Sequence, residues 1–303
     1  MTIRVLHLDT GRSMRGGQWQ VLLLARELAR TGVPQELLVP EGALLLQHAR
    51  EAGIPASPIG WSALWRAARR CNVIHAHDAR AHTMAVAAAW EKPLVVSRRV
   101  AFPVKTSLLS RLKYARGSVY LAVSNFVSQQ LSAAGIPPEK VRVVPDAVEL
   151  PPPYEPVARD AIVALDSDDP GKGGALIREA ARMAGFDVLF SSDLQRDLQK
   201  ARMFVYISDS EGLGSAALLA MAHGVPVIAS RVGGLPEAVE DRVTGLLTAN
   251  RVEEIAKVMR KMWLDPQMAA RMGAAGRERA SARFSPATMT TAVIEVYRQV
   301  SAC

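Results

Sequence analysis

Residues 211–240 read EGLGSAALLAMAHGVPVIASRVGGLPEAVE, and this stretch decides the fold. Residues 216–222 are apolar on every side of a helix, so a helix here must be covered all round, and Gly224 is placed to end it. The β-rich run 225–229 is typical of a strand buried in a parallel sheet. Two glycines then precede Pro236, a residue favoured where a helix begins. The stretch therefore predicts a buried helix–strand unit bounded by two glycine-containing loops.

The loop at Gly233 and Gly234 favours an anionic ligand. Glycines before a helix start leave backbone amides free, and the helix end itself attracts negative charge. Glu211 places a carboxylate beside the other loop. A carboxylate next to an anion site indicates a neutral polyol beside a phosphate, which is the chemistry of a nucleotide-sugar. A buried βαβ unit without a ligand is the alternative.

The same residues resemble the donor-binding signature of family-four retaining glycosyltransferases, which have the two-domain GT-B fold. That signature is Glu, seven residues, Glu, then Ala-Met-Ala-x-Gly-x-Pro-Val. Glu211 and residues 220–227 match it, but Leu219 stands in place of the second Glu. The resemblance implies that Glu211 is catalytic and contacts the transferred sugar, while the ribose contact of the second Glu is not carried over. It also implies a donor-binding loop of Gly212, Leu213, Gly214 and Ser215.

Strand and helix patterns alternate along the 303 residues, which predicts parallel sheets with helices on both faces. The proline-rich stretch 150–156 is typical of a linker. We expect Rossmann-like domains over 1–150 and 151–285, and a helix at 286–303 that crosses back to the first domain in the resembled fold. The predicted class is α/β, a GT-B fold with two doubly wound parallel-sheet domains facing across a cleft. Relative to the family, about one strand–helix unit is missing near residue 192.

Composition narrows the class of protein. Apolar residues make up 49% and aromatic residues 5%, so the core is aliphatic. The two cysteines, Cys71 and Cys303, give no disulfide framework and fit a reducing cytoplasm. We find neither a signal peptide after Met1 nor an apolar run of the roughly 18 residues that span a membrane. The net charge of +8 suits nucleic acid or an anionic membrane face. Without a nucleic-acid motif, the membrane or an anionic glycolipid is favoured, and a merely basic surface is the alternative.

Arg15, Gly16 and Gly17 lie between the first predicted strand and the first predicted helix. This is the position of a phosphate loop, although the spacing fits neither the dinucleotide fingerprint nor the ATP loop. The three residues resemble the family's N-terminal loop, which lies under the donor diphosphate. A tight turn with exposed arginines is the alternative.

Lys172 lies in a second glycine-rich turn, DPGKGG, which starts at Asp169. A lysine at such a helix start is a point charge suited to a diphosphate. It resembles the family's Lys-Gly motif, in which the lysine contacts the donor phosphates. The family has an arginine six residues earlier, where this chain has Asp166. An exposed loop lysine is the alternative.

His75 and His77 end a predicted strand, and alternation points both side chains to one face. Ligands bind at the carboxyl ends of such strands, so we interpret His77 as a catalytic residue in the cleft. Asp78 and His82 nearby invite a zinc interpretation, but the spacing does not support it and no cysteine joins them. We therefore expect no metal. A buried imidazole with satisfied hydrogen bonds is the alternative.

Arg98 and Arg99 end the next predicted strand, where paired arginines suit a phosphate or carboxylate on the acceptor. Many relatives have a sugar-contacting histidine near here, which this chain lacks. The basic residues that follow alternate with apolar ones: Lys105, Arg111, Lys113 and Arg116 with Phe102, Leu108, Leu109, Leu112 and Tyr114. Such a mixture is suited to a membrane surface. A solvated basic face is the alternative.

By resemblance, the chain is expected to be a retaining glycosyltransferase that moves a hexosyl or related sugar from a nucleotide-sugar to a saccharide or glycolipid acceptor. We expect a bacterial envelope acceptor of lipopolysaccharide type, a cytoplasmic protein with peripheral association at the inner membrane face, and no nucleic acid. No cofactor or metal is expected, because amides, Lys172 and Arg15 would stabilise the leaving diphosphate. A non-catalytic GT-B binding protein is the rival, since Leu219 and Asp166 depart from the family; a GT-B sugar epimerase is a further alternative.

Overall fold

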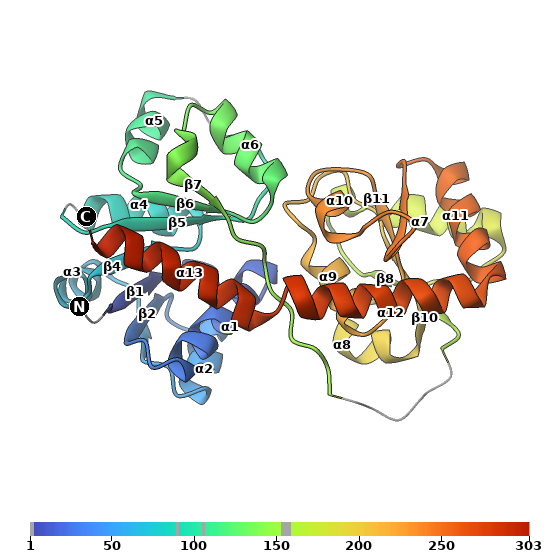
Figure 1. Ribbon diagram of the computed structural model, residues 1–303, viewed down its shortest axis with the longest axis horizontal. Coiled ribbons are helices and arrows are strands. Elements are labelled where there is room, and N and C mark those ends of the chain that lie inside the picture. The colour runs from blue at the N-terminus through green and yellow to red at the C-terminus, as the bar shows by residue number, and fades with distance from the viewer. Residues whose placement is uncertain (1–2, 89–90, 105–106, 153–158, 303) are drawn as a thin grey trace. The chain divides into compact units, whose positions relative to one another are not determined.

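The computed structural model describes residues 3–88, 91–104, 107–152 and 159–302. The chain divides into two compact units (Figure 1). Unit 1 comprises Met1–Asp146 and Pro286–Cys303, and unit 2 comprises Ala147–Ser285. The predicted linker 150–156 lies partly outside the described residues. Among the described residues, no helix combines the length and the apolar character that a membrane span requires.

Unit 1 is built on a sheet of seven strands in the order β3-β2-β1-β4-β5-β6-β7, and every neighbouring pair is parallel. The strands are β1 Val5–Leu8, β2 Gln35–Val39, β3 Ala56–Pro58, β4 Val73–Ala76, β5 Leu94–Arg98, β6 Val119–Ala122 and β7 Val141–Val143. The strand order reverses between β1 and β4. Ligands of such sheets bind at this switch point, outside the carboxyl ends of the strands.

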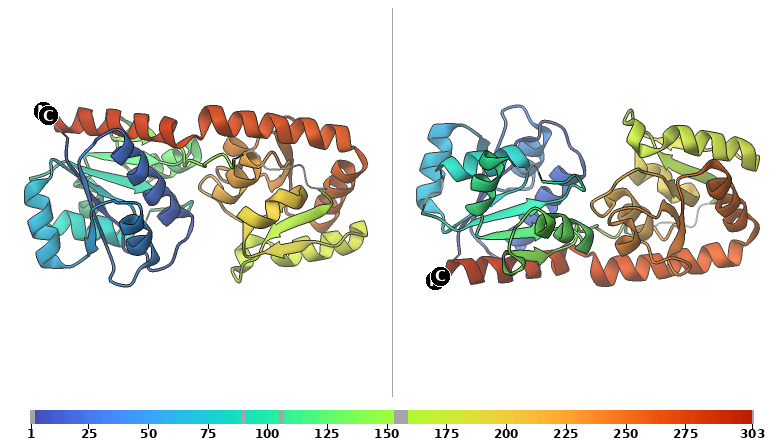
Figure 2. Two further views of the ribbon diagram at one scale, coloured as in Figure 1. Left: turned by 90° about the horizontal axis from the view of Figure 1, so that it is seen from below. Right: turned by 90° about the horizontal axis from the view of Figure 1, so that it is seen from above.

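Helices cover both faces of the unit 1 sheet (Figure 2). They are α1 Gly16–Arg30, α2 Leu44–Glu51, α3 Trp61–Arg70, α4 Ala79–Ala88, α5 Leu108–Ala115, α6 Asn125–Ala133, the 3₁₀ turn η1 Pro138–Lys140 and α13 Pro286–Ser301. The terminal helix α13 packs against α1 and β4 and so completes the core of unit 1. Its apolar residues Val293 and Val296 are at most 4% exposed.

Unit 2 contains a second parallel sheet with five strands in the order β12-β11-β10-β8-β9. The strands are β8 Ala161–Leu165, β9 Leu189–Ser191, β10 Ala201–Tyr206, β11 Val227–Ser230 and β12 Gly245–Thr248. The helical segments are η2 Pro170–Lys172, α7 Gly174–Ala184, α8 Leu194–Asp197, η3 Leu198–Lys200, α9 Ser215–Ala222, α10 Leu235–Ala238, α11 Val252–Leu264 and α12 Pro266–Arg283. The order reverses between β8 and β10, so this sheet also has a switch point.

The apolar run of the opening stretch forms α9, but it is not covered on all sides. Ala217, Leu218 and Met221 are fully buried, whereas Ser215, Ala216 and Leu219 are partly exposed on one side of the helix. The complete burial predicted from composition is therefore wrong for that side. The apolar side chains at 216 and 219 thus keep some contact with water.

Helix α12 covers α9 through glycines. A Cβ atom on Gly273 would lie 2.2 Å from the carbonyl oxygen of Gly224, the residue with φ of 68° that ends α9. A Cβ atom on Gly276, one turn further along α12, would meet Met221 Cγ at 3.4 Å, which is ordinary contact. The approach of α12 to the end of α9 therefore requires glycine at position 273 and not at 276.

We expect Gly273→Ala to lower the free energy of unfolding by about 1–3 kcal/mol, because the added methyl group must push backbone away from backbone. Gly276→Ala is the matched control and is expected to leave stability unchanged or raise it by up to about 1 kcal/mol, the gain in helix propensity. Urea unfolding followed by circular dichroism measures both. Equal effects of the two variants would contradict this account of the packing.

Candidate functional site

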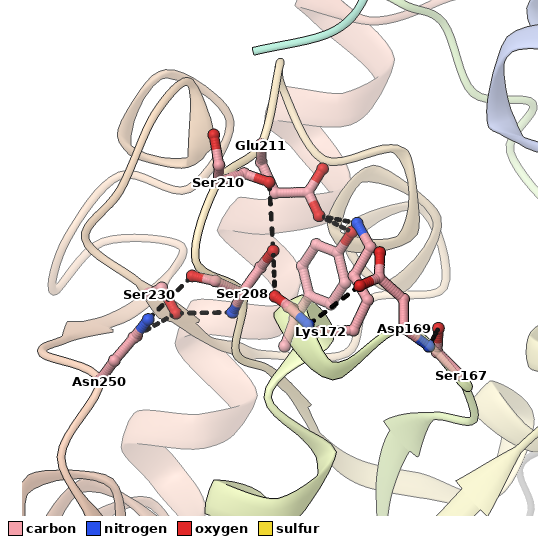
Figure 3. A network of polar contacts seen from close by, with 10 residues as sticks. Ser167, Asp169, Lys172, Ser208, Ser210, Glu211, Ser230 and Asn250 are labelled. Atoms are coloured by element: carbon pink, nitrogen blue, oxygen red, sulfur yellow. Dashed lines mark hydrogen bonds and ion pairs between the residues drawn. The ribbon is translucent and has the colours of Figure 1, made fainter. Parts of the chain in front are cut away.

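Glu211 and Lys172 form an ion pair at the carboxyl edge of the unit 2 sheet (Figure 3). Lys172 Nζ donates to Glu211 Oε1, and the Tyr206 hydroxyl donates to the same oxygen at 2.6 Å. The side chains of Glu211 and Lys172 are 12% and 26% exposed, so the pair still reaches solvent. The structure thus brings together the two residues that the sequence assigned separately to the sugar and to the diphosphate.

The turn that carries Lys172 is bound to the loop that carries Glu211. Gly173 has φ of 63°, and a Cβ atom there would lie 2.6 Å from Ile207 Cγ2. The Gly171 carbonyl accepts from the Asp209 amide at 2.8 Å and from the Ser208 hydroxyl at 3.1 Å. The glycines therefore allow a close backbone approach that fixes the separation of Lys172 and Glu211.

A second set of hydrogen bonds joins the ends of β10, β11 and β12 below this loop (Figure 3). The Ser208 amide donates to Ser230 Oγ at 2.9 Å, and the Ser230 hydroxyl donates to Asn250 Oδ1 at 2.5 Å. Asn250 Nδ2 donates to the Ser208 carbonyl at 2.9 Å. This closed ring of bonds holds the segment immediately before Glu211.

The glycine pair at 233 and 234 supports Glu211 from the other side. Gly233 has φ of 55°, and a Cβ atom there would lie 2.2 Å from the Glu211 carbonyl oxygen. The Gly234 amide donates to that carbonyl at 2.9 Å. The interpretation of this loop as an anion site with free amides is therefore wrong for Gly234, because its amide already binds the protein backbone.

Tyr206 is the residue at this site that the sequence reasoning missed. It ends β10 and is only 4% exposed. Burial, together with the neighbouring Glu211 carboxylate, raises the pKa of Tyr206 well above its usual value. Its hydroxyl therefore stays protonated and donates to Glu211. A tyrosine five residues before the signature glutamate was the available signal, but in a buried strand it reads only as core.

The remaining predicted donor-side residues have mixed positions. Gly214, with φ of 102°, lies directly before α9, and Ser215 is partly exposed in the first turn. Gly212 is buried, and the side chain of Leu213 is 3% exposed and belongs to the core. At Leu213, only backbone atoms are left to contact a ligand. Their assignment to donor binding stays a prediction.

The two departures from the family pattern are visible in unit 2. Leu219 is partly exposed on the same side of α9 as Ser215, so no carboxylate is offered there. Asp166 directly follows β8 and is exposed. The position six residues before Lys172, which is an arginine in the family, therefore carries a carboxylate in this chain.

In unit 1, Asp9 and Gln18 organise the loop that contains Arg15, Gly16 and Gly17. Asp9 Oδ1 accepts from the Gly11 amide at 2.8 Å, and both its oxygens accept from Gln18 Nε2 at 3.1 Å. Arg15 is exposed directly before α1, while Gly16 and Gly17 form its first turn. Burial and the nearby Asp78 raise the pKa of Asp9 to about 6. Sequence reasoning missed Asp9, although an acid at the end of the first strand was visible.

His7, His75 and His77 form a buried cluster at the carboxyl ends of β1 and β4, and each is at most 6% exposed. His7 Nδ1 and His77 Nε2 are 3.0 Å apart. His75 Nδ1 lies 2.6 Å from the hydroxyl of Tyr297 on α13, and His75 Nε2 lies 2.8 Å from Ser97 Oγ. The cluster therefore ties α13 to the sheet.

The histidine cluster has some features of a metal site. One ring nitrogen from each histidine lies within 4.8 Å of the others. Burial lowers all three pKa values, that of His7 to about 3, so the rings are neutral. Both nitrogens of His75 are engaged, however, and the Arg99 cation is near enough to lower the pKa values of His75 and His77 further. His7 Nε2 and His77 Nδ1 are buried without a hydrogen-bond partner among the described residues, and the expectation of no metal stays a prediction.

The predicted acceptor-side arginines have separate partners. Arg99 Nε donates to Asp146 Oδ1 at 2.9 Å, and both side chains are at most 14% exposed. Burial raises the pKa of Asp146, and Arg99 opposes this shift. Arg98 donates to the Phe102 carbonyl. Arg99 thus compensates an internal carboxylate, while Arg98 remains partly exposed at the end of β5.

Two models of known protein families match this chain, one in each half of the sequence. The model described as Glycosyltransferase Family 4 matches residues 14–150, and that described as Glycosyl transferases group 1 matches residues 176–279. The chain therefore resembles glycosyltransferases over most of its length. This confirms the family resemblance of the sequence.

Curated relatives match mainly parts of the chain. The alpha-maltose-1-phosphate synthase of Mycolicibacterium smegmatis is 40% identical over 123 residues, which cover 38% of this chain and 32% of that protein. The chain therefore spans about a third of the length of the first relatives it matches. The MMP alpha-(1->4)-mannosyltransferase of Mycolicibacterium hassiacum is 28% identical over 275 residues, covering 76% of this chain and 66% of that protein.

Solved structures show the fold over the whole chain. The Anabaena protein HepE in complex with UDP-glucose has a TM-score of 0.85 at 17% identity, covering 98% of this chain and 100% of that one. A glycosyltransferase from Rickettsia africae has a TM-score of 0.82 at 16% identity and covers 99% and 98%. The GT-B fold with two parallel-sheet α/β domains is confirmed.

The buried histidines predict an acid-labile unit 1. A histidine with a lowered folded-state pKa binds protons mainly after unfolding, so its contribution to stability is complete above about pH 6.5 and is lost as the pH falls towards the folded-state value. Each such histidine contributes a slope of up to about 1.4 kcal/mol per pH unit. Asp9, with a raised pKa, acts in the opposite direction.

We expect His7→Phe to reduce the slope of unfolding free energy against pH by about 1 kcal/mol per unit between about pH 5 and 6. The control is His48→Phe, because the His48 side chain is 33% exposed. Urea unfolding at several pH values measures the slope, and the comparison with wild type removes the contribution of Asp9. An unchanged slope in His7→Phe would mean that His7 is not held neutral by the fold.

Proposed function

We propose that this protein is a retaining glycosyltransferase that moves a hexosyl or related sugar from a nucleotide-sugar to an acceptor hydroxyl without a metal ion. The observation that carries the proposal is the Lys172–Glu211 pair with Tyr206 at the switch point of unit 2. One cation and one carboxylate, held next to each other at a sheet edge, match the diphosphate and the neutral sugar of such a donor.

Donor binding would exchange the partners of this pair. Lys172 would turn from Glu211 to the diphosphate and stabilise the charge that develops on the leaving phosphate. Glu211 would accept hydrogen bonds from the sugar hydroxyls. It would also keep the hydrogen bond that the Tyr206 hydroxyl donates to it. The bond from the anomeric carbon to the phosphate breaks, and the acceptor oxygen bonds on the same face. A phosphate oxygen takes the acceptor proton, so this route needs no side-chain base.

UDP-sugars are the first donors to test, because HepE has a solved complex with UDP-glucose. GDP-mannose comes second, since a Mycobacterium tuberculosis relative, 41% identical over 91 residues, is named a GDP-mannose-dependent mannosyltransferase. For the acceptor we propose a saccharide or glycolipid of the bacterial envelope, of lipopolysaccharide type. The structure of the lipopolysaccharide outer core galactosyltransferase WaaB has a TM-score of 0.64 at 12% identity, covering 92% of this chain and 99% of that one.

We further propose that the protein works in the cytoplasm at the inner face of the membrane, with no nucleic-acid partner. The free thiol of the buried Cys71 is compatible with a reducing compartment. The basic surface of unit 1, described below, supports the membrane contact.

Glu211→Gln keeps the size of the side chain but removes its charge. We expect kcat/KM for sugar transfer to fall by about ten- to a hundredfold, the equivalent of the roughly 1.5–3 kcal/mol of a charged hydrogen bond. Affinity for the free nucleoside diphosphate should change much less. Glu253→Gln, on the exposed surface of α11, is the control. Unchanged transfer by Glu211→Gln in the same donor–acceptor assay would contradict the assignment.

Lys172→Ala should weaken the binding of both UDP and UDP-sugars, because a point charge is lost beside the diphosphate. The loss should be larger at low salt than at high salt, since a partly exposed charge is screened. Isothermal titration calorimetry measures it, with the exposed Lys257→Ala as control. Equal affinities of wild type and Lys172→Ala would overturn the role of this lysine.

The rival function is a non-catalytic GT-B protein that binds a sugar. The partly exposed Leu219, which replaces a family glutamate, favours it. Binding of a nucleotide-sugar without transfer or hydrolysis in the presence of a range of acceptors would support the rival over the enzyme.

A further inference from the structure

Helix α5 turns its apolar side away from the protein. Leu108, Leu109 and Leu112 are 72%, 79% and 58% exposed, and their spacing places them on one stripe of the helix. No residue of α5 is buried. Phe102, in the loop between β5 and α5, is 69% exposed. A helix of a soluble domain normally turns such a stripe towards the core, so α5 has the opposite orientation.

The other side of α5 attaches it to unit 1. The Tyr114 ring packs on Tyr120 at 5.4 Å and meets His82 edge-on at 5.1 Å. The Tyr120 hydroxyl donates to the Tyr114 carbonyl, and Lys113 Nζ donates to the Ala79 carbonyl at 2.7 Å. Helix α5 is therefore attached to unit 1 by the side that carries Tyr114. The leucine stripe has no partner among the described residues.

The surroundings of this stripe are basic. Residues 92–138 contain no Asp or Glu, and their basic residues are Lys92, Arg98, Arg99, Lys105, Arg111, Lys113 and Arg116. Arg111 is exposed on α5 itself. Glu91 and Glu139 flank this run and are exposed outside α5, whereas Asp78 is bonded to Thr10 and Asp146 to Arg99.

A nearby helix of unit 1, α3, also carries exposed tryptophans. Helix α4 contacts both α3 and α5, so the three lie side by side (Figure 1). On α3, Trp61 and Trp65 are 55% and 48% exposed, and Arg66 and Arg69 are exposed next to them. Half-exposed tryptophans beside basic residues are typical of protein surfaces at the headgroup level of a bilayer.

We propose that the α5 surface, defined as Phe102, Leu108, Leu109, Arg111 and Leu112, docks on an anionic lipid bilayer, with the α3 tryptophans as flanking anchors. An apolar stripe gains from entering the headgroup boundary, and the basic side chains around it select anionic headgroups. A second copy of the chain is disfavoured as the occupant, because it would bring one basic surface against another.

This docking deepens the proposed function, on which its biological role rests. The α5 surface follows β5, whose end carries the predicted acceptor-side residue Arg98, which is partly exposed. A bilayer on α5 would thus deliver a lipid-anchored saccharide next to the carboxyl edge of the unit 1 sheet. The acceptor class that follows is a saccharide on a lipid anchor in an anionic membrane.

Co-sedimentation of the full chain with vesicles tests the proposal without donor or acceptor. Wild type should bind vesicles of phosphatidylcholine mixed with phosphatidylglycerol about tenfold more strongly than pure phosphatidylcholine vesicles, and salt should weaken the binding. The triple variant Leu108→Gln, Leu109→Gln, Leu112→Gln should lose about tenfold or more. Glutamine keeps helix propensity, and the leucines are exposed, so folding should be unaffected. Arg111→Gln should lose about fivefold on mixed vesicles.

Leu264→Gln is the matched control, because Leu264 is 79% exposed on unit 2. Its vesicle binding should equal that of wild type. Failure of wild type to bind mixed vesicles, or an equal loss in Leu264→Gln, would overturn the proposal. So would a self-associating wild type that the triple variant makes monomeric without any vesicle binding, since the occupant would then be a second copy.

Hydrolysis of nucleotide-sugars in the absence of vesicles separates this proposal from the proposed function. Turnover without vesicle binding would reject only the docking surface. Vesicle binding by a chain that turns over no donor, even with acceptor present, would reject only the glycosyltransferase.

Discussion

The carboxyl edge of the unit 2 sheet depends on how closely two turns approach the loop that carries Glu211. Gly173 and Gly233 both have positive φ, and a Cβ atom on either would lie within 2.6 Å of that loop. Side chains are thus excluded where the backbones meet, and amide hydrogen bonds take their place. The backbone of Glu211 is then fixed by the fold, and Lys172 and Tyr206 hold its carboxylate. Preorganisation of this kind lets a site stabilise developing charge without reorganising during the reaction.

The same geometry keeps the Glu211 carboxylate hydrogen-bonded whether or not Lys172 is paired with it. A lysine and a glutamate near each other satisfy one another in the free protein, and a ligand that takes the lysine would leave the glutamate without a partner. Tyr206 prevents this, because its buried hydroxyl stays protonated and remains bonded to Glu211. A ligand can therefore engage Lys172 without leaving the carboxylate unpaired, which would cost free energy in a partly buried site.

Local sequence patterns predicted the backbone well and the side-chain partners poorly. The buried strand β11, the glycine that ends α9 and the parallel alternation are encoded in short-range patterns, and the structure contains them. The full burial of α9 and the free amide of Gly234 were wrong, because each depends on which other segment lies opposite. The hydrogen bonds from Tyr206 to Glu211 and between His75 and Tyr297 could not be predicted, because the residue types alone do not indicate which side chains meet in the fold. The sequence showed that Leu219 departs from the family, but only the structure shows that this side of α9 is partly exposed to solvent.

The polar residues of unit 1 divide into groups that keep the fold and groups that remain able to titrate. The imidazole of His7, with a pKa of about 3, is neutral at neutral pH, and the pKa values of His75 and His77 are also low. An imidazole in that state can hold a hydrogen bond but is a poor general base, whose pKa should lie near the operating pH. Asp9 has a pKa of about 6 at the same carboxyl edge, because burial and Asp78 outweigh the bonds from Gly11 and Gln18. His75 therefore fastens α13 through Tyr297, the catalytic role expected of His77 stays a prediction, and Asp9 is the group of that edge whose pKa lies nearer to neutrality.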